Sequence, residues 1–384
     1  LFRSIPFALA ISAAAFIAFY YWERKREAEG KSVLLDLSLF KITSFRNGSI
    51  AALIISMGEF GLIELLTKSF ENKVDSTIKA VGDDAAVIQR DENTVTLITT
   101  DFLLEGVHFN LMYMPFKHLG YKAIVTNLSD IIAMNGTPEQ VTVSIAVSSR
   151  FPVEAIEELY EGIKLACSVY NVDLIGGDTT SSLQGLMISV TAIGKTEKDK
   201  VVYRSGAKPN DLLVVSGDLG GAYMGLQVLE REKSVFEANP TIQPDLDGFD
   251  YIIERQLKPE ARIDILQYLK ELDVLPTAMI DISDGLASEV LHLCKESGVG
   301  ARVYNDKLPI DTVTSTAAIS FNLDPVTCVL NGGEDYELLF SIAPADYEKI
   351  KGNPNMTVIG YVTDKTEGEY LVDKNDSLVK LRAQ

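Results

Sequence analysis

The sequence predicts an α/β (α+β) protein of two domains. From Met57 onward, runs of β-branched residues with the length of strands alternate with stretches of helical periodicity. The chain has 384 residues, whereas one domain takes about 150. A polar stretch at 194–200 separates two such alternating regions. We therefore expect one domain over residues 57–195 and a second over 196–384.

The first domain is expected to begin with a helix and to continue with strands around a second helix. Phe60, Ile63, Leu66 and Phe70 recur at helical spacing. The clearest helix covers residues 151–167, because its apolar side chains form a single stripe. The predicted strands, which are rich in β-branched or apolar residues, are 95–100, 141–147 and 186–193.

The second domain is expected to begin with a buried strand near Asp211, at residues 212–216. A glycine-rich turn at 217–221 then leads into a helix at 222–230. The stretch 232–250 is polar, contains two prolines and is predicted to be irregular. Later elements are predicted in this order: helices 259–271 and 285–297, then strands 337–343 and 356–362.

Residues 1–56 form an N-terminal extension with two interpretations. An apolar run at 5–22 is long enough for a membrane helix, and the basic residues that follow it would keep the rest of the chain in the cytoplasm, tethered to the inner face of the membrane. Alternatively, the chain begins with Leu1 rather than Met, and the protein starts at Met57. Both interpretations place the two domains in the cytoplasm.

Charge and cysteine content exclude several classes of protein. The 54 acidic and 35 basic side chains give a net charge of −19. An acidic surface repels nucleic-acid phosphates unless metal ions intervene, so no nucleic-acid partner is expected. With 47% hydrophobic residues, the chain is neither disordered nor dependent on disulfides. Cys167, Cys294 and Cys328 are widely spaced, which indicates reduced thiols in or near the core.

Aspartates carry the chemical signal of this sequence. Five short segments place them beside glycine or hydroxyl residues, at what we interpret as the ends of apolar strands: 81–86, 99–101, 127–130, 176–179 and 281–285. Carboxylates that meet at one point repel each other unless cations neutralise them. Ligand sets made only of oxygen suit Mg²⁺, Mn²⁺ or Ca²⁺. The five segments together therefore predict a cation site, although each segment alone is more typical of a turn than of a metal site.

Other phosphate-binding signals are weaker. The sequence has no GxxxxGK[ST] loop, no GxGxxG before a helix and no HExxH. The glycine-rich segments 217–221 and 331–334 could bind anions through backbone N–H groups or be ordinary turns. Arg204 could reach a phosphate or lie in a surface linker. His108 could belong to the site or be a structural imidazole.

Taken together, these segments resemble the thiamine-monophosphate kinase family, within a superfamily that includes aminoimidazole ribonucleotide synthetase. The resemblance runs from Met57 to near the end of the chain and is most specific in GEF (58–60), EGVHF (105–109) and GGEDYEL (332–338). Motifs shared more widely are VGDDA (81–85), KAIVTNLSD (122–130), LIGGDTT (174–180), RSGAKP (204–209) and IDISDGL (280–286).

The resemblance implies ATP-dependent phosphorylation of thiamine monophosphate to thiamine diphosphate, with several Mg²⁺ ions. It implies an aminoimidazole ribonucleotide synthetase-like fold, in which N-terminal domains form a β-barrel in a homodimer and the C-terminal domain is α/β. The implied metal ligands are Asp84, Thr99, Thr100, Asp101, Asp130, Asp178, Asp281 and Asp284, of which Asp101, Asp130 and Asp284 are the catalytic set. The implied ATP contacts are Tyr170, Gly177, Arg204 and Ser283, and the implied thiamine-side contacts are His108 and Glu334.

One feature departs from the family pattern. The family usually ends in a glycine-aromatic segment that stacks on thiamine, and this sequence stops at Gln384, where that segment should begin. Two alternatives therefore stay open beside the kinase. One is another ATP-using member of the superfamily, and the other is a non-catalytic module that binds divalent cations.

Overall fold

The computed structural model describes residues 61–383. The predicted membrane segment 5–22 and the remainder of the 1–56 extension lie outside the described residues. Within the described part of the chain, no helix is long and apolar enough to cross a membrane. The described residues 61–71 belong to one unit, and residues 72–383 belong to a second, larger unit. In the first unit, residues 61–67 are helical, within the helix predicted from Phe60 to Phe70.

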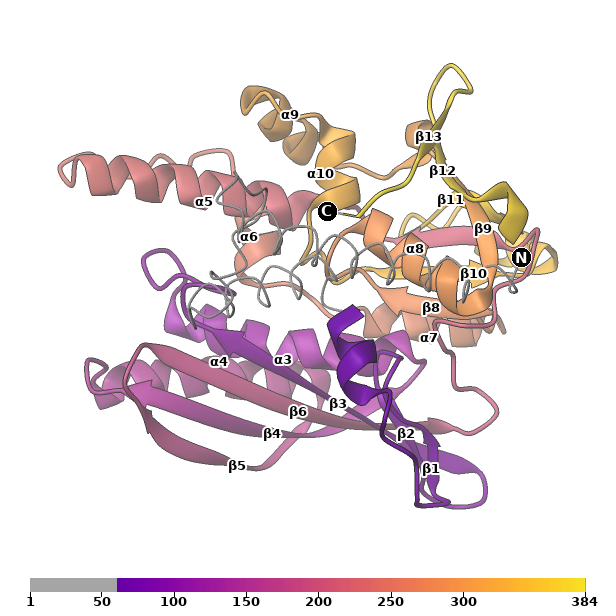
Figure 1. Ribbon diagram of the computed structural model, residues 1–384. Coiled ribbons are helices and arrows are strands. Elements are labelled where there is room, and N and C mark those ends of the chain that lie inside the picture. The colour runs from indigo at the N-terminus through magenta and orange to yellow at the C-terminus, as the bar shows by residue number, and fades with distance from the viewer. Residues whose placement is uncertain (1–60, 384) are drawn as a thin grey trace, which may run out of the picture. The chain divides into compact units, whose positions relative to one another are not determined.

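The first part of the large unit is a six-stranded sheet (Figure 1). Its strands, in spatial order, are β1 (Thr77–Lys79), β2 (Ala86–Gln89), β3 (Thr94–Leu104), β6 (Leu186–Glu197), β4 (Thr137–Ser148) and β5 (Asp173–Ser182). Neighbouring strands are antiparallel except for β4 and β5, which are parallel. The predicted strands 95–100, 141–147 and 186–193 are confirmed as parts of β3, β4 and β6. The described strands form an open sheet, so they do not close the predicted barrel within one chain.

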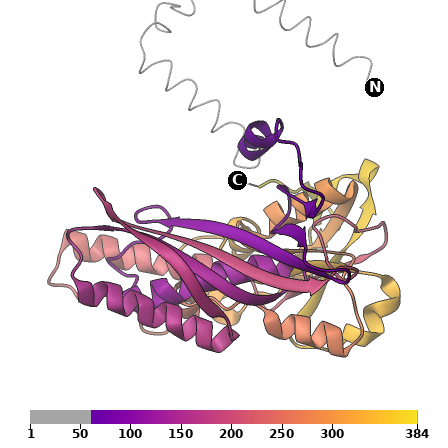
Figure 2. The same cartoon turned by 90° about the horizontal axis from the view of Figure 1, so that it is seen from below.

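Two long helices, α3 (Phe116–Ala133) and α4 (Val153–Tyr170), pack on this sheet (Figure 2). The helix predicted at 151–167 is confirmed by α4, within a few residues at each end. Residues of β6 alternate between buried and half-buried, since one face of the sheet meets the helices. This packing makes α3 a central element between the sheet and the rest of the large unit.

The second part of the large unit is a seven-stranded sheet with helices around it (Figure 1). Its strands, in spatial order, are β13 (Leu378–Lys380), β12 (Glu369–Val372), β9 (Val299–Tyr304), β11 (Met356–Asp364), β7 (Leu212–Ser216), β10 (Leu338–Ile342) and β8 (Ala278–Asp281). The main helices are α5 (Gly221–Ala238), α6 (Asp250–Leu257), α7 (Ile263–Glu271), α8 (Leu286–Ser297), α9 (Thr312–Ser320) and α10 (Pro325–Asn331). The short helix α11 covers Tyr347–Ile350. The strands predicted at 212–216, 337–343 and 356–362 and the helix predicted at 285–297 are confirmed.

Two predictions for this region were wrong in extent. Helix α5 continues to Ala238, so the stretch 232–250 is not irregular throughout. Its residues 231–238 include good helix formers, and the first proline follows only at position 240. The helix predicted at 259–271 is α7, which begins only at Ile263, and the separate helix α6 that precedes it was not predicted. Pro259 disfavours helical backbone at Lys258, so α6 ends there.

One continuous core joins the two sheets. Its buried side chains include Leu97 and Ile188 from the first sheet, Ile124 from α3, and Met279 and Phe340 from the second sheet. The three cysteines are free, as predicted, and Cys294 and Cys328 are buried. Because this core is shared, residues 72–384 form one compact unit, and the domain boundary at 195/196 stays a prediction.

Candidate active site

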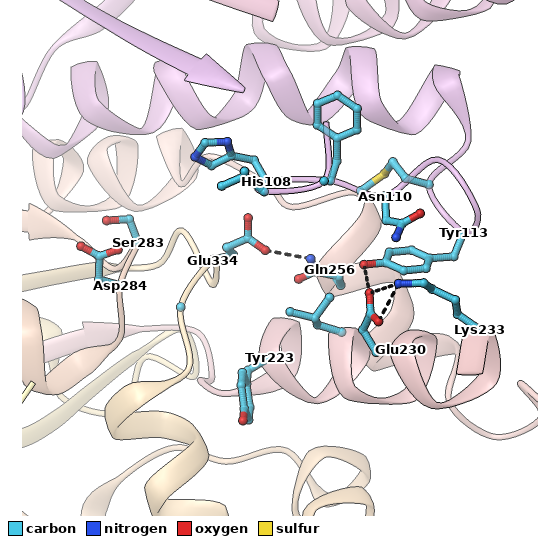
Figure 3. Close-up of a pocket in the computed structure, with 16 residues that line it drawn as sticks. His108, Asn110, Tyr113, Tyr223, Glu230, Lys233, Gln256, Ser283, Asp284 and Glu334 are labelled. Atoms are coloured by element: carbon cyan, nitrogen blue, oxygen red, sulfur yellow. Dashed lines mark hydrogen bonds and ion pairs between the residues drawn. The ribbon is translucent and has the colours of Figure 1, made fainter. Parts of the chain in front are cut away.

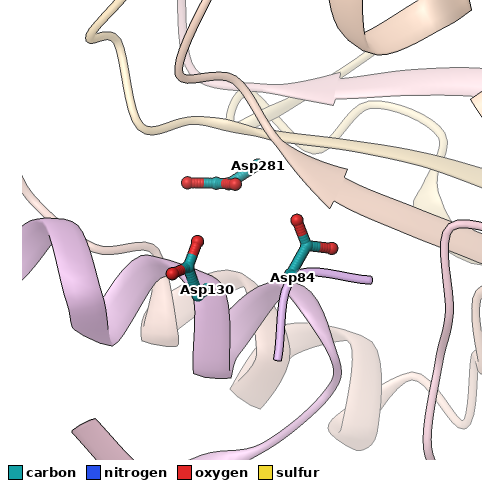
Figure 4. Close-up of side chains that lie close together, drawn as sticks. All are labelled: Asp84, Asp130 and Asp281. Carbon is teal, nitrogen blue, oxygen red and sulfur yellow. The ribbon is translucent and has the colours of Figure 1, made fainter. Parts of the chain in front are cut away.

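Three carboxylates meet where the two sheets face each other across α3. Asp84, Asp130 and Asp281 each offer an oxygen, and these oxygens lie within 4.8 Å of one another (Figure 4). Asp84 comes from the loop before β2, Asp130 from α3 and Asp281 from the end of β8. Three distant parts of the sequence therefore contribute one acid each.

Hydroxyl groups orient two of these acids. Thr99 on β3 donates to Asp130 Oδ2 at 2.7 Å, and Ser129 donates to Asp281 Oδ2 at 2.6 Å. Ser129 and Asp130 are neighbours on α3, so this helix supplies one acid of the cluster and the group that orients another. The third acid, Asp84, accepts hydrogen bonds at Oδ1 from Nε and Nη2 of Arg204, at 3.1 and 2.6 Å.

Burial and mutual repulsion raise the pKa values of the cluster. Burial is the main cause for all three acids. It raises the pKa of Asp84 to about 7, where the nearby Asp281 adds to the effect and Arg204 opposes it. The pKa of Asp130 lies well above its usual range, since Asp281 and Asp101 also repel its charge. The cluster therefore needs protons or cations to be stable.

The donor chemistry of the cluster fits a hard divalent cation. All three ligands are carboxylate oxygens, which Mg²⁺, Mn²⁺ and Ca²⁺ prefer. Asp84 Oδ2 is buried and has no hydrogen-bond partner, although buried polar atoms usually have one. A cation bound between Asp84, Asp130 and Asp281 would satisfy this oxygen and neutralise the charges together.

A cavity of about 590 Å³ adjoins the segment that follows Asp281 (Figure 3). Ser283 and Asp284 line one side of it, and Tyr113, Glu230 and Lys233 lie on the other side in this view. Its remaining lining includes His108, Phe109, Asn110, Tyr223, Gln256 and Glu334. The lining thus combines charged, amide and aromatic side chains, which suits a small organic ligand with a charged group.

Backbone hydrogen bonds fix the segment between the cluster and the cavity. Glu289 Oε1 accepts hydrogen bonds from the N–H groups of Ser283 at 3.1 Å and Asp284 at 2.8 Å. The N–H of Glu334 donates to the carbonyl of Ser283 at 2.7 Å. Asp281, Asp284 and Glu334 are therefore positioned by one connected stretch of backbone contacts.

The structure brings together nine of the residues predicted for the site. Asp84, Asp130 and Asp281 form the cluster, with Thr99 and Arg204 bonded to it. Ser283, Asp284, His108 and Glu334 line the cavity. The functional roles assigned to all of them stay predictions.

Asp101 lies close to these residues, and four other predicted residues lie apart. The N–H of Asp101 donates to Asn127 Oδ1 at 3.0 Å, and its charge raises the pKa of Asp130. The four residues outside the cluster and outside the cavity lining are Thr100, Tyr170, Gly177 and Asp178. Thr100 donates to the carbonyl of Val190, Tyr170 donates to Glu260, and Gly177 and Asp178 belong to β5.

The interpretation that the aspartates end apolar strands was largely wrong. Asp130 lies on α3, while Asp101 and Asp178 lie inside strands β3 and β5. Asp281 ends a strand as expected. The error at Asp130 arises because α3 is buried almost throughout. Its sequence therefore lacks the apolar stripe and opposite polar face by which a surface helix is identified.

Hydrogen bonds bear on two of the open alternatives. The N–H groups of Gly220 and Ala222 donate to the carboxylate of Asp335, at 2.7 and 3.2 Å, so the turn at 217–221 is a structural helix start. For His108 both alternatives stay open. Its Nδ1 accepts a hydrogen bond from the N–H of Leu104 at 3.0 Å, and the residue lines the cavity.

Several polar residues at the site escaped the sequence analysis. They are Lys122, Glu289, Tyr113, Glu230, Lys233 and Gln256. Tyr113 donates to Glu230 Oε1 at 2.7 Å, across 117 positions of sequence. No local signal predicts such pairs. Of these six residues, only Lys122 lies inside a motif named in the sequence analysis, KAIVTNLSD at 122–130.

Comparison with known proteins identifies the family to which the chain belongs. Residues 82–196 match the model of the AIR synthase related protein N-terminal domain, and residues 208–373 match that of the C-terminal domain. The chain thus has a two-domain fold of this type, with mixed α/β content.

Relatives with curated names are similar over nearly their whole length. The chain is 37% identical to the thiamine-monophosphate kinase of Aquifex aeolicus, over 83% of this chain and 95% of that protein. It is 34% identical to that of Bacillus subtilis, over 82% and 94%. A solved structure described as AaThiL complexed with AMPPCP and TMP superposes with a TM-score of 0.72, at 34% identity, over 84% of this chain and 95% of that one.

Proposed function

The chain belongs to the thiamine-monophosphate kinases of the AIR synthase related family, and from this premise we propose the reaction that it catalyses. It is a kinase that transfers the γ-phosphoryl group of ATP to the phosphate of thiamine monophosphate and produces thiamine diphosphate and ADP. The observation that carries this function is the junction of the cavity with the carboxylate cluster. One short segment, from Asp281 to Asp284, connects them.

The acceptor in this reaction is already a phosphate anion, so the enzyme needs no strong general base. The obstacle is repulsion between the acceptor and the phosphates of ATP. Side chains on the thiamine side therefore have to hold the acceptor in line and exclude water. We assign this task to His108 and Glu334, which both line the cavity.

Mg²⁺ fits the acidic cluster, and we assign its binding to Asp84, Asp130 and Asp281. When bound, Mg²⁺ would supply the positive charge that neutralises the phosphate oxygens. Asp101, Asp284, Thr99, Thr100 and Asp178 are further candidate ligands. Arg204 and Ser283 are candidate ATP contacts beside the cluster, and Tyr170 and Gly177 are candidates on α4 and β5.

We also propose that the chain acts as a homodimer in the cytoplasm. The half-buried face of the six-stranded sheet carries short polar residues such as Thr142, Ser144, Ser189 and Thr191. A second copy could pair with this open sheet and close the predicted barrel. Light scattering coupled to gel filtration tests this, and a monomer at micromolar concentration contradicts it.

Release of ADP in the presence of defined substrates tests the proposed reaction. ADP should form only when ATP, thiamine monophosphate and Mg²⁺ are all present, and phosphorus NMR should show thiamine diphosphate as the product. ADP release without thiamine monophosphate would indicate another ATP-using activity. Cation binding without turnover would favour the non-catalytic module.

A further inference from the structure

A buried lysine lies behind the part of the cavity wall that carries Glu334. Lys122, on α3, is 1% exposed. Its Nζ donates to the carbonyl of Gln256 at 2.9 Å and forms an ion pair with Glu334 Oε2 at 3.1 Å. Removal of an ammonium group from water costs several kcal/mol unless close partners compensate. The fold therefore directs a fully buried positive charge at this one carboxylate.

Lys122 and Gln256 bind the same oxygen of Glu334. The amide Nε2 of Gln256 donates to Oε2 at 2.7 Å, and Lys122 Nζ is the second partner of Oε2. In Figure 3, the other oxygen of Glu334 points away from Gln256. The two contacts thus fix the rotation of the carboxylate and present Oε1 to the cavity.

The backbone of Glu334 is also held in a defined conformation. Its φ of +67° lies in the left-handed region, which costs a non-glycine residue about 1 kcal/mol or more. Arg255, the neighbour of Gln256 on α6, donates to Glu337 Oε1 at 2.9 Å. Two consecutive residues of α6 therefore clamp both ends of the segment that begins at Glu334.

We propose that Lys122 is a positioning residue for the acceptor substrate. With Gln256, it orients the Glu334 carboxylate so that Oε1 faces the positively charged thiazolium ring of thiamine monophosphate. This inference rests on the proposed function, which supplies the cationic acceptor. Lys122 itself does not touch the substrate, because its ammonium is buried behind Glu334.

The substitution Lys122→Met tests this role, since it keeps the length of the side chain and removes the charge. The Glu334 carboxylate then loses its charged hydrogen-bond partner. We expect the KM for thiamine monophosphate to rise about tenfold or more, while the KM for ATP stays unchanged. Calorimetry with thiamine monophosphate alone should show the same loss of affinity. Lys351→Met is the matched control, because Lys351 forms an exposed ion pair with Glu348 and should leave both KM values unchanged.

A double-mutant cycle separates positioning from a structural role. If Lys122 acts through Glu334, Lys122→Met should add no further rise in the KM for thiamine monophosphate to the variant Glu334→Gln. Additive effects, an equal rise in the KM for ATP, or a wild-type KM for thiamine monophosphate in folded Lys122→Met would overturn the proposal. If Lys122→Met does not fold, Gln256→Met removes the other donor to Oε2 and gives the same test. A wild-type protein that releases no ADP would refute the proposed function instead.

Discussion

Asp84 and Asp281 are buried and Asp130 is half-buried, and the chain neutralises the charges of these three acids only in part. Arg204 pairs with Asp84, whereas the bonded partners of Asp130 and Asp281 are neutral hydroxyl groups. Two like charges about 4 Å apart repel by about 4 kcal/mol at an effective dielectric constant of 20. Protons or bound cations would relieve this repulsion between the carboxylates, and a bound cation would also attract phosphate groups.

The substitution Asp101→Asn should reduce turnover by at least about 10²-fold, on the scale of lost electrostatic stabilisation at an active site. The charge of Asp101 acts on Asp130, and its backbone N–H is held by Asn127, so the change removes charge without loss of that contact. Steady-state ADP release measures the effect. Asp199→Asn, at an exposed turn, is the control. A turnover rate near that of the wild type would contradict the assignment of Asp101 to the cation site.

Residue types at the site were predictable, but their grouping was not. The motifs identified Asp84, Asp130 and Asp281 as candidate ligands because acids beside glycine and hydroxyl residues stand out in sequence. Which of the candidates meet depends on contacts between distant segments, such as Ser129 with Asp281 across 152 positions. Lys122 was not recognised, since a buried lysine has no sequence pattern of its own.

Among the elements, α3 is the one on which the site depends, and it is also one of the helices that the sequence analysis missed. It carries Lys122, Asn127, Ser129 and Asp130. The helix contacts α4 and the first sheet on one side, and α6 and β8 on the other. A helix covered on all sides has no polar stripe, so periodicity could not identify it. Helix α4 was predicted because one of its faces is exposed.

Glycines allow α3 and α4 to approach closely, and this predicts the effect of Gly162→Ala. A Cβ atom at Gly162 would lie 1.9 Å from the carbonyl oxygen of Lys117 on α3. The atom in the way belongs to the backbone of α3, which cannot move aside as a flexible side chain could. We therefore expect the free energy of unfolding to fall by about 1–3 kcal/mol. Urea denaturation measures it. Gly176→Ala is the control, because a Cβ atom there meets nothing within 4 Å. Equal stability of the two variants would contradict the close helix crossing.

At the scale of the whole molecule, the net charge of −19 is partly a property of the site. Asp84 and Asp281 are among the buried acids of the chain, and the half-buried Asp130 is the third member of the cluster. The acidic composition predicted that phosphates would bind only with the help of cations, and this expectation agrees with the cluster. The order of the strands in the two sheets and their shared core were not predictable, because they depend on long-range pairing.

The raised pKa values of buried acids predict how pH and Mg²⁺ together affect stability. Burial raises the pKa of Asp84 from 3.8 to about 7 and that of Glu289 from 4.5 to about 8. Between the ordinary and raised values the native state binds more protons than the unfolded state, so the stability of the metal-free protein falls as pH rises through this window. We expect the Tm in EDTA to be lower at about pH 8 than at about pH 5.5, by on the order of 5 °C. Mg²⁺ should raise the Tm more at the higher pH, because it binds the deprotonated carboxylates. The variant Asp84→Asn should reduce both effects. A metal-free Tm that rises with pH, or a Mg²⁺ effect of equal size at both pH values, would show that the cluster does not bind cations in exchange for protons.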